Sequence, residues 1–280
     1  EALLSFSKEI NRKFDFIGVY AGSDFGLLTV AYINSSLALS GPRPEDVKRA
    51  LNKYESKKIW LEGGIPTPKM TLVKSEAELK NSIVEGGYSF PLIVKPLDSC
   101  GSQGVVSAYN ITGAVTGFHE AQCYSDSVLV EEFFEGIGID VNGILWGGNF
   151  IPCGIAERFF SNPPFHFPMK GRVPVSILSE EVQRTAYDLV RDACLLLGLD
   201  NTPVKGDLLY SNGKFVILEV APRFHGDVVT TKLLPYFSGS SPIQLLFSLL
   251  AQRSVRSLPN FKGEGAAVTI WKAIFPKIKE

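Results

Sequence analysis

The sequence predicts an α+β protein that opens with a short α/β segment. Two pairs of strand-like runs are separated by glycine-containing turn sequences: residues 139–146 and 150–158 by Gly147-Gly148, and residues 207–210 and 214–220 by Ser211-Asn212-Gly213. Glycine and asparagine are the residues that tight hairpin turns prefer. Residues 180–197 carry a long amphipathic pattern that ends at Gly198, which predicts a helix. Antiparallel hairpins combined with helices define the α+β class.

The first part of the chain contains one predicted strand and two predicted helical segments. Residues 15–20 (DFIGVY) form a short apolar run before Gly22, which is typical of a buried parallel strand. Residues 27–40 predict a helix that Gly41-Pro42 would stop, and residues 44–61 carry a second helical pattern. Glycine and proline crowd residues 63–68 (GGIPTP), so we expect a break between domains near this point.

The middle of the chain is rich in predicted strands. Apolar runs predict strands at residues 91–95, 105–109 and 127–131, and a further strand-like run follows at 266–271. Ser75 and Glu78 have the spacing of a helix-capping box, which predicts a helix that ends near Gly86. A weaker helical pattern covers residues 114–123.

Composition and charge argue against several classes of partner. The 28 basic and 29 acidic residues give a net charge of −1, so no basic field indicates nucleic acid or an anionic membrane. The four cysteines form no Cys-x-x-Cys pair, which argues against a zinc site or disulfide framework and favours a reducing cytoplasm. No apolar run reaches the roughly 18 residues of a membrane span. We expect further sequence beyond both ends, because the chain starts within a helical pattern and stops just after a strand-like run.

The first chemical signal is Lys95 and the loop that follows it. Lys95 ends a predicted strand, and residues 96–104 (PLDSCGSQG) lead into the next one. Small residues let backbone N–H groups close over phosphates, and a lysine adds a point charge beside them. No Gly-Lys-Ser/Thr sequence and no helix follows, so this is not a Walker loop. A purely structural hairpin loop is the alternative interpretation.

The second signal is the acidic end of a strand at residues 129–136 (LVEEFFEG). A strand that runs into a short linker can offer alternating backbone donors and acceptors to an adenine edge, while apolar rings pack on its face. The alternative interpretation is an ordinary acidic strand end.

The third signal is a pair of carboxylates on one predicted hairpin. Asp207 opens one strand and Glu219 closes the other, so the two can meet across the pair. Carboxylates of this kind hold Mg²⁺ against phosphates. Lys205 lies on the same strand face as Asp207 by the period-two rule, and Arg223 follows closely. Two cations around two carboxylates suit a phosphoryl-transfer centre, although a structural ion cluster is equally compatible with the pattern.

The order of these signals resembles the ATP-grasp superfamily over residues 15–239. The matching stretches read ALNKYESKKIWLEGGIPTP, PLIVKPLDSCGSQGV, LVEEFFEGIGIDVNG and KGDLLYSNGKFVILEVAPR. The nearest likeness is to carboxylate–amine ligases and carbamoyl-phosphate synthase-like proteins. The resemblance implies an ATP-grasp fold of two α/β lobes at residues 53–280, the small lobe at about 66–130 and the large lobe at about 131–280. A partial Rossmann-like pre-ATP-grasp domain would occupy residues 1–52.

The resemblance implies two groups of nucleotide-binding residues. The phosphate-binding group consists of Lys53 and Lys95, with a mobile flap from Gly101 to Gly104 above them, where the hydroxyls of Ser99 and Ser102 would assist. The adenine-binding group consists of the Glu131 side chain and the backbone of Glu132 and Phe134. Many relatives place a ribose-binding glutamate where this chain has Gly138, and Asp140 is expected to serve instead.

The resemblance also implies a metal site and two catalytic residues. Asp207 and Glu219 would bind Mg²⁺, with Mn²⁺ as an alternative, while Lys205 and Arg223 would steady the transferred phosphoryl group. Many relatives carry asparagine two residues after the second metal ligand, where this chain has Ala221, so a second ion would be held more loosely.

The activity implied is an ADP-forming ligase that activates a carboxylate as an acyl-phosphate for attack by an amine. Its partners would be small molecules, with homodimerisation left open. One alternative activates bicarbonate or another one-carbon acid, and a second binds nucleotide without turnover. Residues 156–176, including Arg158, Lys170 and Arg172, are expected to help select the substrate.

Three histidines are weaker candidates. His119 sits on a predicted helix and is interpreted as a solvated side chain, while His166 lies in a proline-rich aromatic loop where packing and substrate contact are equally plausible. His225 follows the Pro-Arg element closely enough to touch a substrate.

Overall fold

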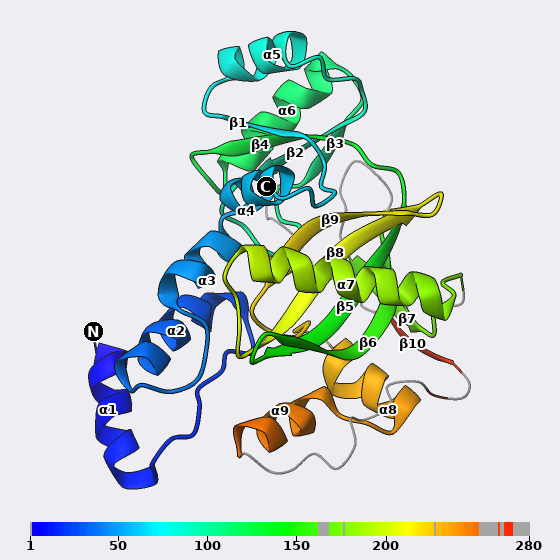
Figure 1. Ribbon diagram of the computed structural model, residues 1–280. Helices are drawn as coiled ribbons and strands as arrows, with labels where there is room; N and C mark the ends of the chain where they lie inside the picture. The colour runs from blue at the N-terminus through cyan, green and yellow to red at the C-terminus, as the bar shows by residue number, and fades with distance from the viewer. Residues whose placement is uncertain are drawn as a thin grey trace, which may run out of the picture.

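The computed structural model describes residues 2–161, 168–175, 177–226, 228–251, 263 and 266–270. Two antiparallel sheets form the frame (Figure 1), one of four strands and one of six. The four-stranded sheet and its helices lie at the top of the view, and N-terminal helices lie along one side of the larger sheet. This is the mixed α+β architecture that the sequence predicts.

The N-terminal part is helical throughout its regular elements. It consists of α1 (Ala2–Phe14), a 3₁₀ turn at Asp24–Gly26, α2 (Leu27–Ser36), α3 (Pro44–Leu51) and α4 (Lys53–Glu62). The strand predicted at residues 15–20 is wrong, because this segment forms neither strand nor helix. The Rossmann-like character expected for residues 1–52 is therefore not confirmed.

Asn34 gives the Val19 backbone the partners that a neighbouring strand would otherwise supply. Its side-chain carbonyl accepts a hydrogen bond from the Val19 N–H at 3.0 Å, and its amide donates to the Val19 carbonyl at 2.8 Å. Val19 is partly buried, where unpaired backbone groups cost free energy, and the buried Asn34 side chain partners both its N–H and its carbonyl. A short apolar run whose backbone is hydrogen-bonded by a side chain has the same sequence pattern as a buried strand.

Asn52 divides the helical pattern at residues 44–61 into two helices. Its side chain accepts hydrogen bonds from the N–H groups of Tyr54 and Glu55, both at 3.1 Å, and so caps the start of α4. Trp60 then anchors α4 to the larger lobe, because its indole N–H donates to the Ala193 carbonyl at 3.0 Å. The cap and the anchor fix the direction of the helix that carries Lys53.

The small lobe is a four-stranded antiparallel sheet with two helices. Its strands follow the order β1-β4-β2-β3: β1 (Met70–Val73), β4 (Val128–Glu132), β2 (Leu92–Pro96) and β3 (Val106–Ala108). Helices α5 (Glu76–Glu85) and α6 (Ile111–Gln122) complete a core that includes Leu79, Leu92 and Phe118. The predicted cap of α5 is confirmed, since the Ser75 hydroxyl accepts from the Glu78 N–H at 3.2 Å. Strand β1 was not predicted.

The large lobe is a six-stranded antiparallel sheet in the order β10-β7-β6-β5-β8-β9. Its strands are β10 (Ala267–Ile270), β7 (Pro168–Val173), β6 (Asn149–Phe160), β5 (Ile137–Trp146), β8 (Thr202–Ser211) and β9 (Lys214–Ala221). Both predicted hairpins, β5–β6 and β8–β9, are confirmed. The central strand β5 is buried along nearly its whole length because helices cover both faces of the sheet.

The two faces of the large sheet pack against different helices. Val141 and Leu208 share a core with α7 (Glu180–Leu196), on one face. On the other face, Ile144 packs with α9 (Pro242–Leu250), and Ala156 packs with α8 (Leu234–Ser238) and the preceding π-helical turn (Val229–Leu233). Because side chains alternate along a strand, residues between those facing α7 point to the opposite side. That side holds the candidate site.

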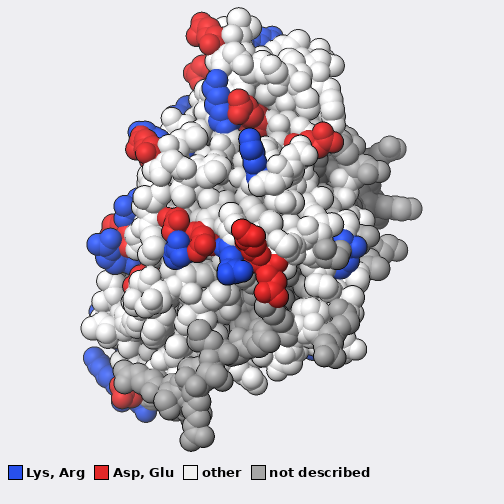
Figure 2. Space-filling model, turned by 45° about the vertical axis from the view of Figure 1, so that its right-hand side comes forward, with Lys and Arg blue, Asp and Glu red and all other residues white. Residues whose placement is uncertain are grey.

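The surface carries mixed charge. On the face shown in Figure 2, basic and acidic side chains lie next to one another, in keeping with the net charge of −1. Within the described part of the chain, no helix has both the length and the apolar character to cross a membrane.

Replacing Asn34 by alanine should destabilise the protein by about 1–3 kcal/mol, because Val19 would lose both backbone partners in a partly buried place. Urea unfolding measures the change. Asn149→Ala is the matched control, since the exposed Asn149 side chain donates only to Gly147. Equal midpoints for the two variants would contradict the role given to Asn34.

Candidate active site

A cavity of about 420 Å³ lies where the two lobes meet. The small lobe contributes the loop after β2 and the end of β4, and the large lobe contributes residues of β5, β8 and β9. Every nucleotide-binding, metal-binding and catalytic residue predicted from the sequence except Gly104 lines this cavity. The structure therefore brings together residues that lie more than 150 positions apart in the chain.

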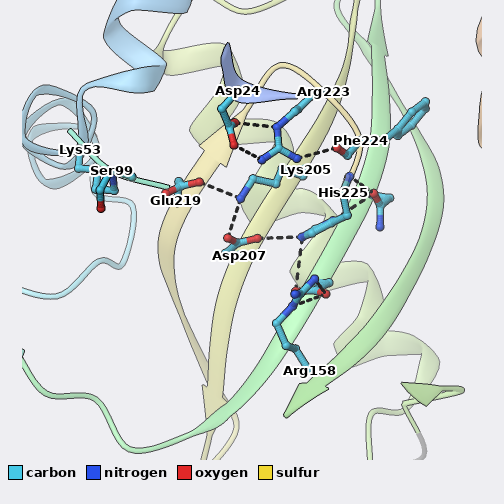
Figure 3. Close-up of polar contacts among 12 residues, drawn as sticks. Asp24, Lys53, Ser99, Arg158, Lys205, Asp207, Glu219, Arg223, Phe224 and His225 are labelled. Carbon is cyan, nitrogen blue, oxygen red and sulfur yellow. Dashed lines mark hydrogen bonds and ion pairs between the residues drawn. The ribbon is translucent and has the colours of Figure 1, made fainter. Parts of the chain in front are cut away.

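The carboxylates of Asp207 and Glu219 face one ammonium group at the centre of the site. The two residues are paired across β8 and β9. Lys205 Nζ donates to Asp207 Oδ2 and to Glu219 Oε1, each at 2.7 Å, and stands between them in Figure 3. The side chains of Asp207 and Glu219 keep 34% and 30% of their surface exposed, so a ligand in the cavity can reach them.

A bulge in β9 turns Glu219 toward the cavity. Asp207 pairs with Glu219, whereas the next residue, Leu208, pairs with Ile217, so Leu218 is an extra residue in β9. Ile217 and Val220 both pack in the core under α7. In a regular strand Glu219 would share the face of Ile217, and the extra residue reverses this. The meeting of the two carboxylates therefore depends on the bulge.

The three central groups hold one another in their charged forms. Burial opposes the ammonium of Lys205, but Asp207 and Glu219 outweigh it and raise its pKa. Burial likewise opposes both carboxylates, but Lys205 with Lys53 lowers the pKa of Glu219, and Lys205 with His225 and Arg158 lowers the pKa of Asp207 well below its usual range. The site thus presents two anions and one cation to the cavity.

His225 and Asp140 extend the cluster beyond Asp207. His225 Nε2 lies 2.8 Å from Asp207 Oδ1 and 3.4 Å from Asp140 Oδ1, while His225 Nδ1 lies 3.1 Å from the Asn142 side-chain oxygen. Burial opposes a charged ring, but the two carboxylates outweigh it and raise the pKa of His225. Arg158 holds Asp140 from the other side, with Nε at 2.8 and 2.7 Å from the two carboxylate oxygens.

These contacts bear on two expectations. His225, a weak candidate in the sequence, is a direct neighbour of Asp207. Asp140 lines the cavity as expected, but its carboxylate is already paired with Arg158 and His225. A ribose contact by Asp140 stays a prediction. The Asp140 carboxylate would have to accept hydrogen bonds from the ribose while it remains paired with Arg158 and His225.

A second charged cluster lies under the small lobe. The buried carboxylate of Glu131 is 2.8 Å from Lys95 Nζ and 3.5 Å from Lys57 Nζ. Lys57 also donates to the Thr67 hydroxyl at 2.9 Å, and that hydroxyl donates to the Ile217 carbonyl of β9 at 2.8 Å. Burial lowers the pKa of Lys57 to about 8, although Glu131 acts against the change. Lys57 was not predicted as a site residue, because in the sequence it is one of several lysines in a predicted helix.

The loop after β2 is tied down by Lys53. Its ammonium donates to the carbonyls of Leu97 at 3.1 Å and Ser99 at 2.6 Å, and the Ser99 hydroxyl donates to the Gln103 carbonyl at 3.0 Å. Gly104 has a φ of +71° and its missing side chain leaves room for Tyr124, since a Cβ there would lie 2.8 Å from that ring. The loop is a tight glycine turn that Lys53 holds at its start.

The linker between the lobes lines the cavity as expected. Phe134 and its neighbours at 133–136 connect β4 to β5. The Glu132 N–H donates to the Lys69 carbonyl at 3.0 Å and so continues the pairing of β1 with β4. The adenine contacts assigned to Glu131, Glu132 and Phe134 stay predictions, and the Glu132 N–H is committed to the sheet.

Asp24 is a site residue that the sequence reasoning missed. Both of its carboxylate oxygens accept from Arg223, from Nε at 2.7 Å and from Nη2 at 2.6 Å (Figure 3). Arg223 Nη1 also donates to the Phe224 carbonyl at 2.9 Å. One bidentate edge of Arg223 is therefore filled by a residue 199 positions earlier. No local pattern around Asp24 signals this pair.

The substrate-selecting segment is described only in part. Arg158 reaches the cavity through Asp140, whereas Arg172 pairs with Glu157. His166 lies outside the described residues, as does the side chain of Lys170. His119 is exposed on α6, 3.3 Å from Glu76, as interpreted from the sequence.

Two lobes that enclose a cavity with a glycine turn and a carboxylate pair define a class of nucleotide-binding folds. The ATP-grasp domain family matches residues 50–227 of the chain. The chain belongs to this family, as the sequence resemblance implied.

The matches to curated relatives include most of this chain but a smaller share of each relative's own length. The uncharacterized protein y4rH of Sinorhizobium fredii is 27% identical over 81% of this chain and 47% of its own length. The D-alanine–D-alanine ligase of Ectopseudomonas mendocina is 28% identical over 76% of this chain and 68% of its own. The chain thus spans about half of the first relative and two thirds of the second.

Solved structures share the fold at low sequence identity. The L-amino acid ligase of Bacillus licheniformis has a TM-score of 0.78 at 20% identity, covering 95% of this chain and 64% of that protein. Phosphoribosylglycinamide synthetase of Anaerococcus prevotii has a TM-score of 0.71 at 20% identity, covering 94% and 66%. These likenesses confirm the ATP-grasp fold.

The lowered pKa of Lys57 predicts a pH-dependent stability. Between pH 8 and 10.5 the unfolded chain holds the Lys57 proton more tightly than the folded protein, so folding becomes more favourable as the pH rises. The free energy of unfolding of the wild-type protein should rise relative to Lys57→Met by up to about 3 kcal/mol across this window. Denaturant titrations at several pH values measure it. The exposed Lys58→Met is the control, and parallel curves for Lys57→Met and wild type would contradict the effect.

Proposed function

We propose that this chain is the ATP-binding core of an ADP-forming ligase that activates a carboxylate as an acyl-phosphate for attack by an amine. The observation that carries the proposal is the Asp207–Lys205–Glu219 cluster facing a cavity under a glycine turn. Phosphoryl transfer needs charge stabilisation and positioning more than covalent help from the protein. Ligases among the relatives, such as the D-alanine–D-alanine and L-amino acid ligases, support the same chemistry.

The donor set at the centre fits a magnesium ion. Asp207 and Glu219 offer ionised oxygen ligands from adjacent strands, which suit Mg²⁺ and also Mn²⁺. When bound, the ion would offset negative charge on the phosphates. Ala221, with no oxygen in its side chain, adds no ligand to this set, so we propose one firmly held ion.

The lysines would bind and orient the triphosphate of ATP, which is consumed as a substrate. Lys95 projects from β2 into the cavity, and Lys205 projects from β8 on the opposite lobe. Lys53 lies beside the flap, 2.6 Å from the Ser99 carbonyl, and would reach a phosphate only by exchanging that contact. The three ammonium groups would then surround the charge that shifts during transfer.

Arg223 would steady the substrate carboxylate or the acyl-phosphate. Its Nε and Nη2 groups already donate to Asp24 and its Nη1 group donates to the Phe224 carbonyl, which leaves one N–H on each of Nη1 and Nη2 for a ligand in the cavity. Asp24 also fixes the orientation of the guanidinium, so Arg223 is preorganised. The flap at 101–104 would close over the reactants and keep water from the acyl-phosphate.

Small-molecule acids and amines fit a cavity of about 420 Å³. A cytoplasmic location and a homodimer stay predictions. Bicarbonate remains an alternative acid, because solved neighbours include a biotin carboxylase domain crystallised with bicarbonate.

Glu219→Gln should weaken Mn²⁺ binding by on the order of 100-fold, since a direct ligand loses its charge and even outer-shell changes weaken metals 10- to 100-fold. Titration of Mn²⁺ by electron paramagnetic resonance in the presence of ATP measures it, and circular dichroism should show an intact fold. Glu85→Gln, on the exposed side of α5, is the control. Unchanged Mn²⁺ affinity in Glu219→Gln would remove the metal assignment.

The activity itself is tested by ADP release across a panel of amino acids, small carboxylates and amines. We expect release only when an acid and an amine are both present. Labelled bicarbonate that enters a product would favour the one-carbon alternative. Nucleotide binding without ADP release for any pair, or without Mg²⁺ dependence, would favour a binding module and count against the ligase.

A further inference from the structure

Strand β9 lies at one edge of the six-stranded sheet, and a segment between the lobes closes part of that edge. The Ile217 N–H donates to the Pro66 carbonyl at 2.8 Å. The Thr67 hydroxyl donates to the Ile217 carbonyl, also at 2.8 Å. Both backbone groups of Ile217 therefore have partners outside the sheet, in the stretch of chain that leads from α4 to β1.

Ile217 is the residue directly before the bulge in β9. Leu218 is the extra residue of that bulge, and Glu219 follows it. A bulge leaves its extra residue outside the regular pairing and disrupts the ladder at that point. A slip of one residue in the pairing would turn Glu219 back to the face that packs under α7. The contacts of Ile217 with Pro66 and Thr67 hold the strand at the place where such a slip would begin.

Lys57 fixes the direction of the hydrogen bond from Thr67. Its ammonium lies 2.9 Å from the Thr67 hydroxyl and can only donate. A hydroxyl has a single proton, so Thr67 accepts from Lys57 and gives that proton to the Ile217 carbonyl. Lys57 and Thr67 are both buried, so bulk water does not compete for this hydroxyl.

Glu131 offsets the charge of Lys57 and connects it to the small lobe. A buried ammonium costs free energy unless it is paired. The Glu131 carboxylate lies 3.5 Å from Lys57 Nζ and 2.8 Å from Lys95 Nζ. Glu131 and Lys95 line the main cavity from the small lobe, and Glu219 lines it from the large lobe. Lys57 and Thr67, which are buried and do not line the cavity, connect these two walls.

We propose that Lys57 and Thr67 are positioning residues, whose hydrogen bonds to each other and to Ile217 hold the β9 bulge and keep the Glu219 carboxylate turned toward the cavity. The inference rests on the proposed function, in which Glu219 binds Mg²⁺. The same buried contacts then set Glu219 of the large lobe and Glu131 of the small lobe in one relative position. Removing the Thr67 hydroxyl should therefore weaken metal binding although no ligand is removed.

Amide hydrogen exchange in the protein without nucleotide or metal tests the bulge itself. Thr67→Val keeps the shape of the side chain and removes the hydroxyl, whereas Thr67→Ser keeps the hydroxyl. We expect Thr67→Val to speed exchange at Ile217 and Glu219 about tenfold relative to the amides of β5, as expected for one lost hydrogen bond, and Thr67→Ser to leave it unchanged. Equal acceleration across the whole sheet, or none at the bulge, would overturn the proposal.

Titration of Mn²⁺ by electron paramagnetic resonance in the presence of ATP tests the consequence for Glu219. Thr67→Val should weaken Mn²⁺ binding about tenfold or more, because the partners that orient a metal ligand typically contribute about 10- to 100-fold to affinity. Thr67→Ser should bind Mn²⁺ like the wild type. Thr116→Val removes an exposed hydroxyl that donates to the Thr112 carbonyl in α6, and it is the matched control. Wild-type Mn²⁺ affinity in Thr67→Val would overturn the proposal.

Lys57→Met tests whether the lysine acts through Thr67. The effects of Lys57→Met and Thr67→Val on Mn²⁺ affinity should not add in the double variant, because both changes disrupt the same contact. Additive effects would overturn the role given to Lys57. If Lys57→Met does not fold, the two Thr67 variants still decide the proposal.

These measurements separate the positioning role from the ligase proposal because none of them needs turnover. If no pair of substrates releases ADP but Thr67→Val loses Mn²⁺ affinity, the ligase proposal fails and the positioning role stands. If the wild-type enzyme is active and Thr67→Val binds Mn²⁺ normally, the positioning role fails alone. If the wild-type protein binds no Mn²⁺, the metal assignment of Glu219 fails, and hydrogen exchange still decides whether Thr67 holds the bulge.

Discussion

The ammonium of Lys205 between Asp207 and Glu219 is the contact on which the site depends. Two ionised carboxylates on adjacent strands repel each other, and a shared cation at 2.7 Å from each removes that cost. The arrangement also requires the bulge at Leu218, because only the extra residue turns Glu219 to the face of Asp207. Backbone geometry and charge therefore agree: the bulge brings the anions together, and Lys205 makes their proximity stable.

Charge compensation then continues outward from this centre. His225 links Asp207 to Asp140, Arg158 holds Asp140, and Asn142 positions His225 through both its ring and its backbone N–H. On the other side Arg223 and Asp24 form their own pair. The charged side chains of this cavity are already ionised and paired with one another. A charged ligand can therefore replace one of these partners without a change in the protonation of the protein. The hydrogen bond from Lys53 to the Ser99 carbonyl beside the flap could be exchanged for a ligand in the same way.

The two lobes have separate apolar cores, and polar contacts join them. The small-lobe core around Leu79 and Phe118 shares no residue with the core under α7. The connection runs from Glu131 through Lys57 and Thr67 to the backbone of Ile217, which also donates to the Pro66 carbonyl at 2.8 Å. Directional hydrogen bonds at such a seam hold one relative placement of the lobes more specifically than apolar contact does. The cavity forms between the lobes only in that relative placement.

The sequence by itself determined the local geometry: both hairpins, the capped α5, the long α7 and the grouping of Lys205 with Asp207 on one strand face. Each follows from turn chemistry, caps or side-chain period within a few residues. The family, the fold and the main cavity residues were predicted from the resemblance of four ordered motifs to the ATP-grasp superfamily. Only the tertiary structure decided that Val19 bonds to the Asn34 side chain in place of a strand, that a bulge reverses Glu219, that Lys57 reaches Glu131, and that Asp24 fills one edge of Arg223. These contacts join segments that are distant in the sequence. Their geometry is set by burial and by charge pairing, and both arise only when the lobes and the N-terminal helices pack together.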